Sequence, residues 1–109
     1  MIATQAFLGP GGKVVGIRVS GHAGYAEEGK DILCAAASML MHVLEYGIRE
    51  RMRIPCMVQT DPRGAVWDIR WSQRFSQRTE VYTDVVVPLF AMLANQYPDY
   101  IMYREEDVQ

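Results

Sequence analysis

The sequence contains few cysteines, and their positions limit the classes of site that it can hold. Only Cys34 and Cys56 occur among the 109 residues, and they do not form a pair with the spacing of a zinc site. We therefore expect neither a metal nor a cofactor. Two separate thiols, with no basic-then-apolar leader at the first residues, predict a protein of the reducing cytoplasm.

Long apolar runs and an excess of positive charge are also missing. The nearest approach to the ~20 residues that span a bilayer is the interrupted segment 32–44, so we expect a soluble protein without a membrane partner. The formal net charge is −2 and the pI is about 5.6. Such a chain has no long-range attraction to phosphate, so direct binding to nucleic acid is a poor hypothesis. Half of the residues are hydrophobic, which suffices for one core, and we predict a single domain over 1–109.

The central stretch of the chain, residues 21–38, passes from a glycine-rich loop into an alanine-rich helix. Glycine and charge dominate before Asp31, and alanine and leucine dominate from Leu33, so the predicted boundary lies near Asp31. Aspartate is a favoured N-cap, which would place Cys34 in the first turn of the helix. Unpaired backbone N–H groups and the helix dipole stabilise a thiolate there, and the thiolate is the reactive form of cysteine.

His22 lies in the preceding loop, where glycines on both sides allow the chain to fold back toward Cys34. The two residues would then form a nucleophile and its general base. The alternative is that Cys34 is a small core residue and His22 a polar loop residue. Asp31 is a candidate either for helix capping or for orienting the imidazole. Ser38, one turn after Cys34, would either support the site or hydrogen-bond back to the helix carbonyl four residues earlier.

The residues Gly21-His22-Ala23, followed by Gly29-Lys30-Asp31-Ile32-Leu33-Cys34-Ala35-Ala36-Ala37-Ser38, resemble the signature of the ribosomal-processing cysteine protease (Prp) family. The resemblance implies that His22 and Cys34 are the catalytic pair and that the protein is a homodimer. It implies a precursor of large-subunit ribosomal protein L-twenty-seven as partner, whose N-terminal extension is removed. Gly21, Gly29 and Ser38 belong to the same pattern and would support the site. The alternative function is a non-catalytic ribosome-assembly or interaction module with a buried structural cysteine.

Periodicity predicts the remaining elements. We expect strands at residues 1–8, 13–20, 56–60, 65–71 and 100–103, a helix at 32–51, and a charged tail at 104–109. Residues 79–97 fit either a helix kinked at Pro88 or an extended segment 81–87 followed by a short helix. With the helical alternative, the fold class is α+β. It is a two-layer β-β-α-β-β-α-β domain with a mainly antiparallel sheet and two helices on one face.

Three further side-chain groups are assigned to packing rather than to chemistry. His42 is in the long helix without a second ligand at helical spacing, so we predict a surface or packing role. Cys56 begins a strand and is expected to be an unreactive packing residue. Trp67, Ile69 and Trp71 alternate along one strand, which is typical of a core or a dimer interface.

Overall fold

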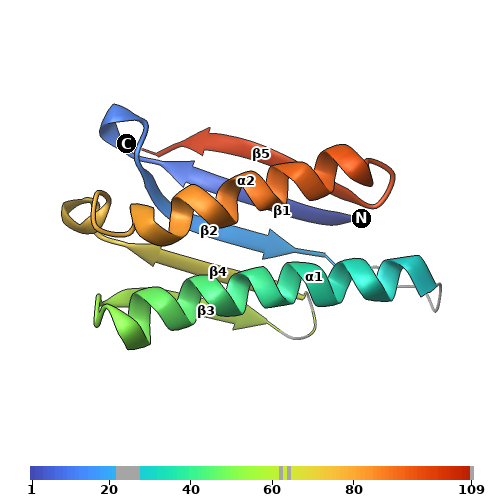
Figure 1. Ribbon diagram of the computed structural model, residues 1–109, viewed down its shortest axis with the longest axis horizontal. Coiled ribbons are helices and arrows are strands. Elements are labelled where there is room, and N and C mark those ends of the chain that lie inside the picture. The colour runs from blue at the N-terminus through green and yellow to red at the C-terminus, as the bar shows by residue number, and fades with distance from the viewer. Residues whose placement is uncertain (22–27, 62, 64, 109) are drawn as a thin grey trace.

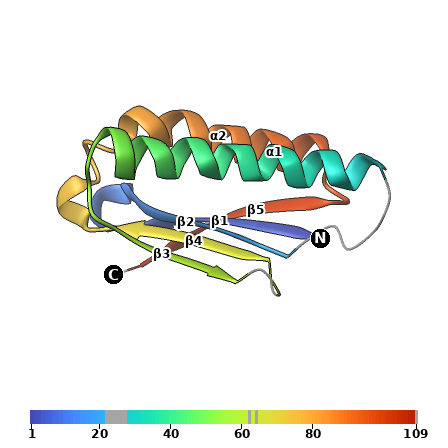
Figure 2. The same ribbon diagram turned by 90° about the horizontal axis from the view of Figure 1, so that it is seen from below.

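The computed structural model describes residues 1–21, 28–61, 63 and 65–108, and it consists of one sheet with two long helices on one face (Figures 1 and 2). The strand order is β3-β4-β2-β1-β5. The strands are β1 (Ile2–Leu8), β2 (Val14–Ser20), β3 (Cys56–Asp61), β4 (Val66–Trp71) and β5 (Ile101–Asp107), and the long helices are α1 (Glu28–Glu45) and α2 (Glu80–Gln96). This arrangement confirms the predicted α+β class.

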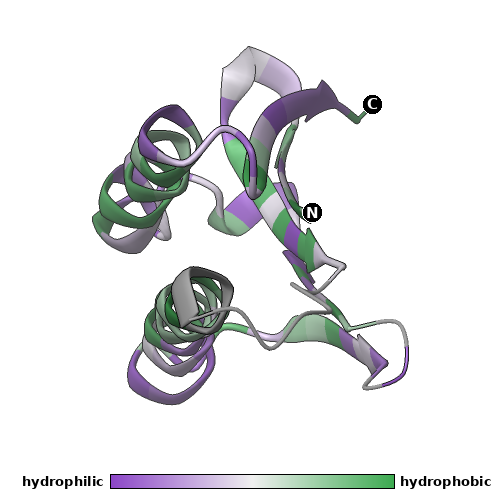
Figure 3. Cartoon of the chain, turned by 90° about the vertical axis from the view of Figure 1, so that its right-hand side faces the viewer, coloured by the Kyte–Doolittle hydropathy of each residue, from purple (hydrophilic) through white to green (hydrophobic). Residues whose placement is uncertain are grey.

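The sheet is mainly antiparallel, as expected. β1 and β2 form an opening hairpin around a short 3-10 turn, Pro10–Gly12, in which Gly11 and Gly12 adopt positive φ angles of 77° and 74°. β2 pairs with β4 and β4 pairs with β3, both antiparallel, whereas β5 pairs with β1 in parallel. A view along the helices shows both of them on the same side of the sheet (Figure 3).

The helix that carries Cys34 begins at Glu28, three residues before the expected boundary at Asp31. The expected N-cap position is therefore wrong: Asp31 lies inside the first turn, and Cys34 lies in the second turn. Local propensity underestimated this end because glycine is only a weak helix breaker in a first turn. An acidic residue at the first helical position also stabilises a helix, because negative charge is favourable at the positive, N-terminal end of the helix dipole.

α1 packs on the sheet through a stripe of apolar residues and continues into a π-helical segment, Tyr46–Arg51. The stripe consists of buried residues at three- and four-residue spacing: Leu33, Ala37, Met41, Leu44 and Ile48. The segment Ile32–Arg51 is long and apolar enough, by length and composition alone, to cross a membrane, which we did not expect from the interrupted run 32–44. The buried stripe also has the pattern of a core helix.

α2 is one helix with Pro88 inside it, so the alternative of a strand followed by a short helix is wrong. Thr83, Val86 and Phe90 are buried against the core. Pro88 is on the exposed side of the helix. Proline has no N–H, so the backbone carbonyl of Asp84 has no helical hydrogen-bond partner. Asp84 is also exposed, and water can replace the missing hydrogen bond.

The expected charged tail is largely a strand. β5 runs from Ile101 to Asp107 and pairs residue by residue with the whole of β1, from Ile2↔Ile101 to Leu8↔Asp107. Its exposed charged residues lie on an edge strand, where charge is favourable because it discourages pairing with other chains. The prediction of a tail from residue 104 was wrong because the pairing that makes this segment a strand is long-range.

Candidate active site

Cys34 is half-buried on α1 and lines a pocket of about 290 Å³. The pocket lies between the helix, the ends of β1 and β2, and the tip of the β3–β4 hairpin. Its lining is mainly apolar and consists of Ile2, Val19, Gly21, Cys34, Ala37, Ser38, Thr60, Asp61, Ala65, Val66 and Trp67. A thiol at the wall of an open, apolar pocket is accessible to a ligand, so Cys34 is not a sealed core residue.

Gly21 forms the rim of this pocket where β2 ends. Its φ angle is +80°, and a Cβ added to it would collide with the carbonyl oxygen of Met1. Glycine is therefore required here both for the backbone conformation and for the close approach of the first strand. The chain leaves the described region directly after Gly21, toward His22.

Ser38 is the second polar residue of α1 in the pocket. It follows Cys34 by one helical turn, is exposed, and lines the same space. Its hydroxyl makes no hydrogen bond to the backbone carbonyl of Cys34 or to any other residue in the described ranges, so the back-bonded arrangement is not found. The structure thus brings together Gly21, Cys34 and Ser38 of the predicted set.

The structure describes the other predicted site residues only in part or not at all. His22 lies in the undescribed segment 22–27, and the pairing of His22 with Cys34 stays a prediction. Gly29 and Asp31 are in the first turn of α1, but the side chain of Asp31 is not described. Among the described residues, no group of three histidine, cysteine or acidic side chains could hold a metal ion.

Sequence reasoning missed the opposite wall of the pocket, which the β3–β4 hairpin supplies. Thr60 and Asp61 end β3, and Ala65, with a positive φ of 49°, leads into β4. An Oδ1 oxygen of Asp61 accepts a hydrogen bond from the backbone N–H of Arg63 at 3.0 Å, which is the side-chain turn expected of aspartate. The predicted strands 56–60 and 65–71 imply a connection here, but its position beside Cys34 depends on sheet order.

Trp67 of β4 is the largest residue in the pocket wall, and it also contacts two residues of α1 that do not line the pocket. Its indole Nε1–H donates to Oε1 of Glu45 at 2.9 Å. The His42 ring meets the Trp67 ring edge-on, with centroids 4.6 Å apart and an interplanar angle of 80°. His42 therefore has the predicted packing role, and Trp67 belongs to both the core and the pocket.

The second thiol, Cys56, lies outside the pocket that Cys34 lines. Cys56 packs against the core, does not line the pocket, and its Sγ donates to the carbonyl of Ile54 at 3.4 Å. Burial raises the pKa of Cys56 to about 11, an effect that the nearby charge of Arg49 only partly opposes. Cys56 is therefore protonated at neutral pH, as expected of a packing residue.

An accessible thiol beside an apolar pocket supplies the nucleophile and the binding space that a cysteine hydrolase needs. A sequence model of the family described as Cysteine protease Prp matches residues 1–102. The chain belongs to this family and is a cysteine protease. No curated protein sequence gives a significant match.

Solved structures share the fold at low sequence identity. SMU.848 from Streptococcus mutans has a TM-score of 0.87 and 21% identity, with 99% of this chain and 96% of that chain covered. The ribosomal processing protease Prp from S. aureus in complex with a substrate peptide has a TM-score of 0.85 and 21% identity, with 97% and 100% covered. The same S. aureus protease with a covalently linked product peptide has a TM-score of 0.83 and 22% identity, with the same coverage.

Proposed function

We propose that this protease removes the N-terminal extension of a ribosomal protein precursor, namely large-subunit protein L-twenty-seven, with Cys34 as nucleophile and His22 as general base. The observation that carries the proposal is the position of Cys34 in the wall of an open pocket, while the only other thiol is protonated and outside it. The S. aureus relative, whose name is ribosomal processing protease, supports the substrate class.

The reaction is acyl transfer in two steps. The Cys34 thiolate attacks the peptide carbonyl carbon, and the C–N bond breaks as the imidazolium of His22 gives its proton to the leaving amine. Water, deprotonated by the same imidazole, then attacks the thioester carbonyl carbon, and the C–S bond breaks, which releases the acid product and restores the Cys34 thiolate and the His22 imidazolium. Donors close to Cys34 would stabilise the oxyanion. The exposed Ser38 hydroxyl on the same side of α1 is one candidate for this role.

The pocket supports a peptide substrate with an apolar side chain next to the scissile bond. Ile2, Val19, Val66 and Trp67 give an apolar lining, and about 290 Å³ is enough for one large side chain. An engineered cavity of roughly 150 Å³ already binds benzene, so a phenyl ring fits here with space left for its backbone.

Asp31 has two roles open to it within the proposal. Since α1 begins before it, a simple N-cap is no longer favoured, and Asp31 either stabilises the first turn through its charge or orients His22. Asp31→Asn removes the charge and keeps the size. Near-normal cleavage by this variant would leave a dyad, and a large loss of rate with unchanged melting would make Asp31 a third member.

The proposal includes a cytoplasmic homodimer without direct contact to nucleic acid or membrane, as the family resemblance and the composition indicate. Light scattering coupled to size exclusion measures the subunit number. A non-catalytic assembly module is less favoured, because its premise was a buried structural cysteine and Cys34 lines an open pocket.

The decisive experiment incubates the protein with extended L-twenty-seven and reads the new N-terminus by mass spectrometry. We expect one cleavage that releases the extension, no cleavage by Cys34→Ala, and retained cleavage by Cys56→Ala. Alanine is a good helix former, so Cys34→Ala should keep the fold, which circular dichroism checks. Cleavage by a folded Cys34→Ala protein would overturn the nucleophile assignment.

A further inference from the structure

Trp67 stands at a junction between the Cys34 pocket and a second, smaller hollow on α1. One side of Trp67 lines the pocket. Its other contacts are with His42 and Glu45, which line the neighbouring hollow of about 150 Å³. The indole thus lies between the Cys34 pocket and two residues of the smaller hollow, and its orientation sets the shape of the pocket wall.

The residues that hold the indole and the residue that reacts are on the same side of one helix. Cys34, Ser38, His42 and Glu45 follow at spacings of four, four and three residues, which places them along one stripe of α1. The stripe faces the β3–β4 hairpin, because Cys34 and Ser38 share a pocket with that hairpin and Glu45 bonds to β4. A rigid helix therefore sets the distance between the thiol and the opposite wall.

The Glu45–Trp67 hydrogen bond has a carboxylate acceptor and favours one orientation of the indole. A tryptophan N–H has one donor and needs a partner when it is partly buried, and a charged acceptor forms the stronger kind of hydrogen bond. The Glu45 side chain is only 25% exposed, and its second oxygen lies 3.4 Å from a guanidinium nitrogen of Arg49. The carboxylate is thus held from both sides, and the indole with it.

We propose that Glu45 is a positioning residue that fixes the Trp67 indole as the wall of the Cys34 pocket and so sets which apolar side chains the pocket accepts. The part of this inference that concerns peptide substrates rests on the proposed function. The part that concerns the shape of the pocket does not. Without Glu45 the indole keeps its packing contacts with the core and with His42 but loses its hydrogen-bond acceptor, so the flat surface against which an aromatic group packs is less firmly held.

The first test measures pocket shape without any protease activity. In a Cys56→Ala background, Cys34 is alkylated with iodoacetamide and, separately, with N-benzyl iodoacetamide, and the ratio of the two rates is determined. We expect the benzyl reagent to be favoured in the parent protein. The preference should fall by about threefold to tenfold in Glu45→Ala, which is the size expected when a typical intramolecular hydrogen bond is lost.

Three control variants accompany this test. Glu45→Gln keeps an acceptor oxygen for the indole and should restore the preference. Glu50→Ala removes an exposed acid from the same hollow that does not bond to Trp67, and it should leave the ratio unchanged. Trp71→Phe removes the other indole donor, which bonds to the Val14 carbonyl at 3.2 Å outside the pocket, and should cost stability without changing the ratio.

The second test follows the indole itself and then the peptides. The Nε1–H resonance of Trp67 should move in Glu45→Ala and stay near its original position in Glu45→Gln. With peptides that differ only in the apolar side chain before the scissile bond, Glu45→Ala should lose discrimination through KM, while kcat for the best peptide changes little.

An unchanged reagent ratio and an unchanged indole resonance in Glu45→Ala would overturn the inference. If no peptide is cleaved by the parent protein while the reagent ratio still depends on Glu45, the proposed function fails and the positioning role stands. If peptides are cleaved with the same discrimination in all variants, the proposed function stands and the positioning role fails.

Discussion

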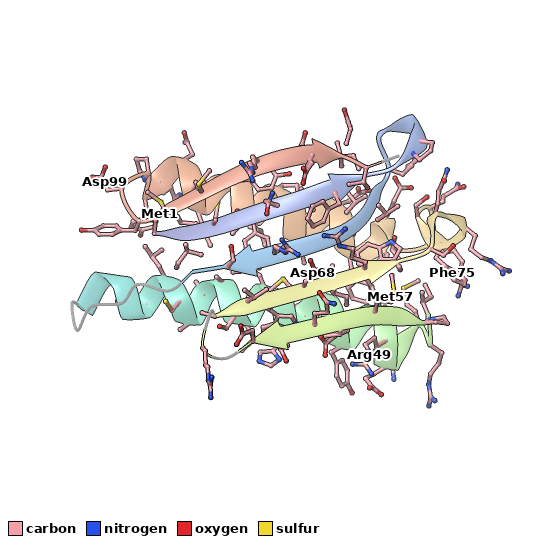
Figure 4. The ribbon with its side chains drawn as sticks, turned by 180° about the vertical axis from the view of Figure 1, so that it is seen from behind. Met1, Arg49, Met57, Asp68, Phe75 and Asp99 are labelled. Atoms are coloured by element: carbon pink, nitrogen blue, oxygen red, sulfur yellow. The ribbon has the colours of Figure 1, made fainter. Side chains whose placement is uncertain are left out.

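The guanidinium carbon of Arg70 lies 3.8 Å from the centre of the Phe7 ring. Arg70 points to the same side of β4 as Asp68, which Figure 4 labels in its view of the sheet face that neither helix covers. Phe7 is only 2% exposed there, although it has no helix above it. Gly16 lies between the two in the sheet, and a Cβ at this position would come within 2.9 Å of the Arg70 side chain. Glycine therefore lets arginine cover an aromatic ring two strands away.

Arg70→Ala should lower the free energy of unfolding by about 1–2 kcal/mol, because it removes a cation–π contact and exposes Phe7. Urea denaturation measures the change. Arg74→Ala is the matched control, since its guanidinium lies 5.1 Å from the Phe75 ring at an exposed site, and its effect should be smaller.

Arg70 also bonds to the buried carboxylate of Asp68, which Arg18 contacts at 2.8 Å. Arg18→Ala therefore removes an Asp68 partner while it leaves Phe7 covered. If Arg18→Ala costs as much as Arg70→Ala, the carboxylate contact explains the loss and the cover over Phe7 contributes little.

Gly21→Ala should destabilise the protein by about 2–3 kcal/mol, because it combines the strain of a positive φ with a collision against the Met1 carbonyl. Gly12→Ala is the control: its φ is +74°, but a Cβ there meets open space, so only about 1 kcal/mol of backbone strain is expected. Thermal unfolding of both variants makes the comparison. Equal losses would mean that the contact at the pocket rim has no energetic role.

The two thiols should differ in their reaction with iodoacetamide. The pKa of Cys56 is about 11, so this residue is mostly protonated at pH 8 and its labelling should rise only as the pH approaches 11. Cys34, in the open pocket, should be labelled near neutral pH. Mass mapping of the labelled native protein between pH 7 and about 11 separates the two sites. Equal labelling at pH 7.5 would contradict the assignment.

If the proposed pair of Cys34 and His22 is correct, His22→Ala should stop peptide cleavage and slow the alkylation of Cys34 near neutral pH, because the thiolate would lose its positive partner. The alkylation rate should reach its maximum at a higher pH than in the parent protein. If alkylation and cleavage are both unchanged, His22 is not the base. His42→Ala then becomes the relevant variant, since His42 is the other histidine of the chain.

Elements with a clear period could be read from the sequence, and those that depend on distant neighbours could not. The alternation of Trp67, Ile69 and Trp71 predicted β4 correctly, and residues 79–97 were resolved as a helix only by the structure. The charged residues of β5 gave no strand signal, because β1 supplies the pairing.

The candidate site also has one part that could be predicted from the sequence and one part that could not. The motif identified Cys34 and Ser38, which share the pocket, and Gly21 at its rim. Glu45 and Trp67 carry no local signal, since their contact requires the β2–β4 register and the packing of α1 over the hairpin. Periodicity identifies the faces of an element but not the element that each face meets.

The parallel pairing of β5 with β1 has a consequence for the order in which the chain can fold. Thr4 donates its hydroxyl hydrogen to the carbonyl of Met102, a contact between residues 98 positions apart. During synthesis, the edge of β1 that pairs with β5 therefore stays unpaired until nearly the whole chain has left the ribosome. An edge of this kind is where nascent chains associate wrongly, and such long-range closure is slow. A chain that stops before Ile101 should consequently aggregate rather than accumulate as a smaller folded protein.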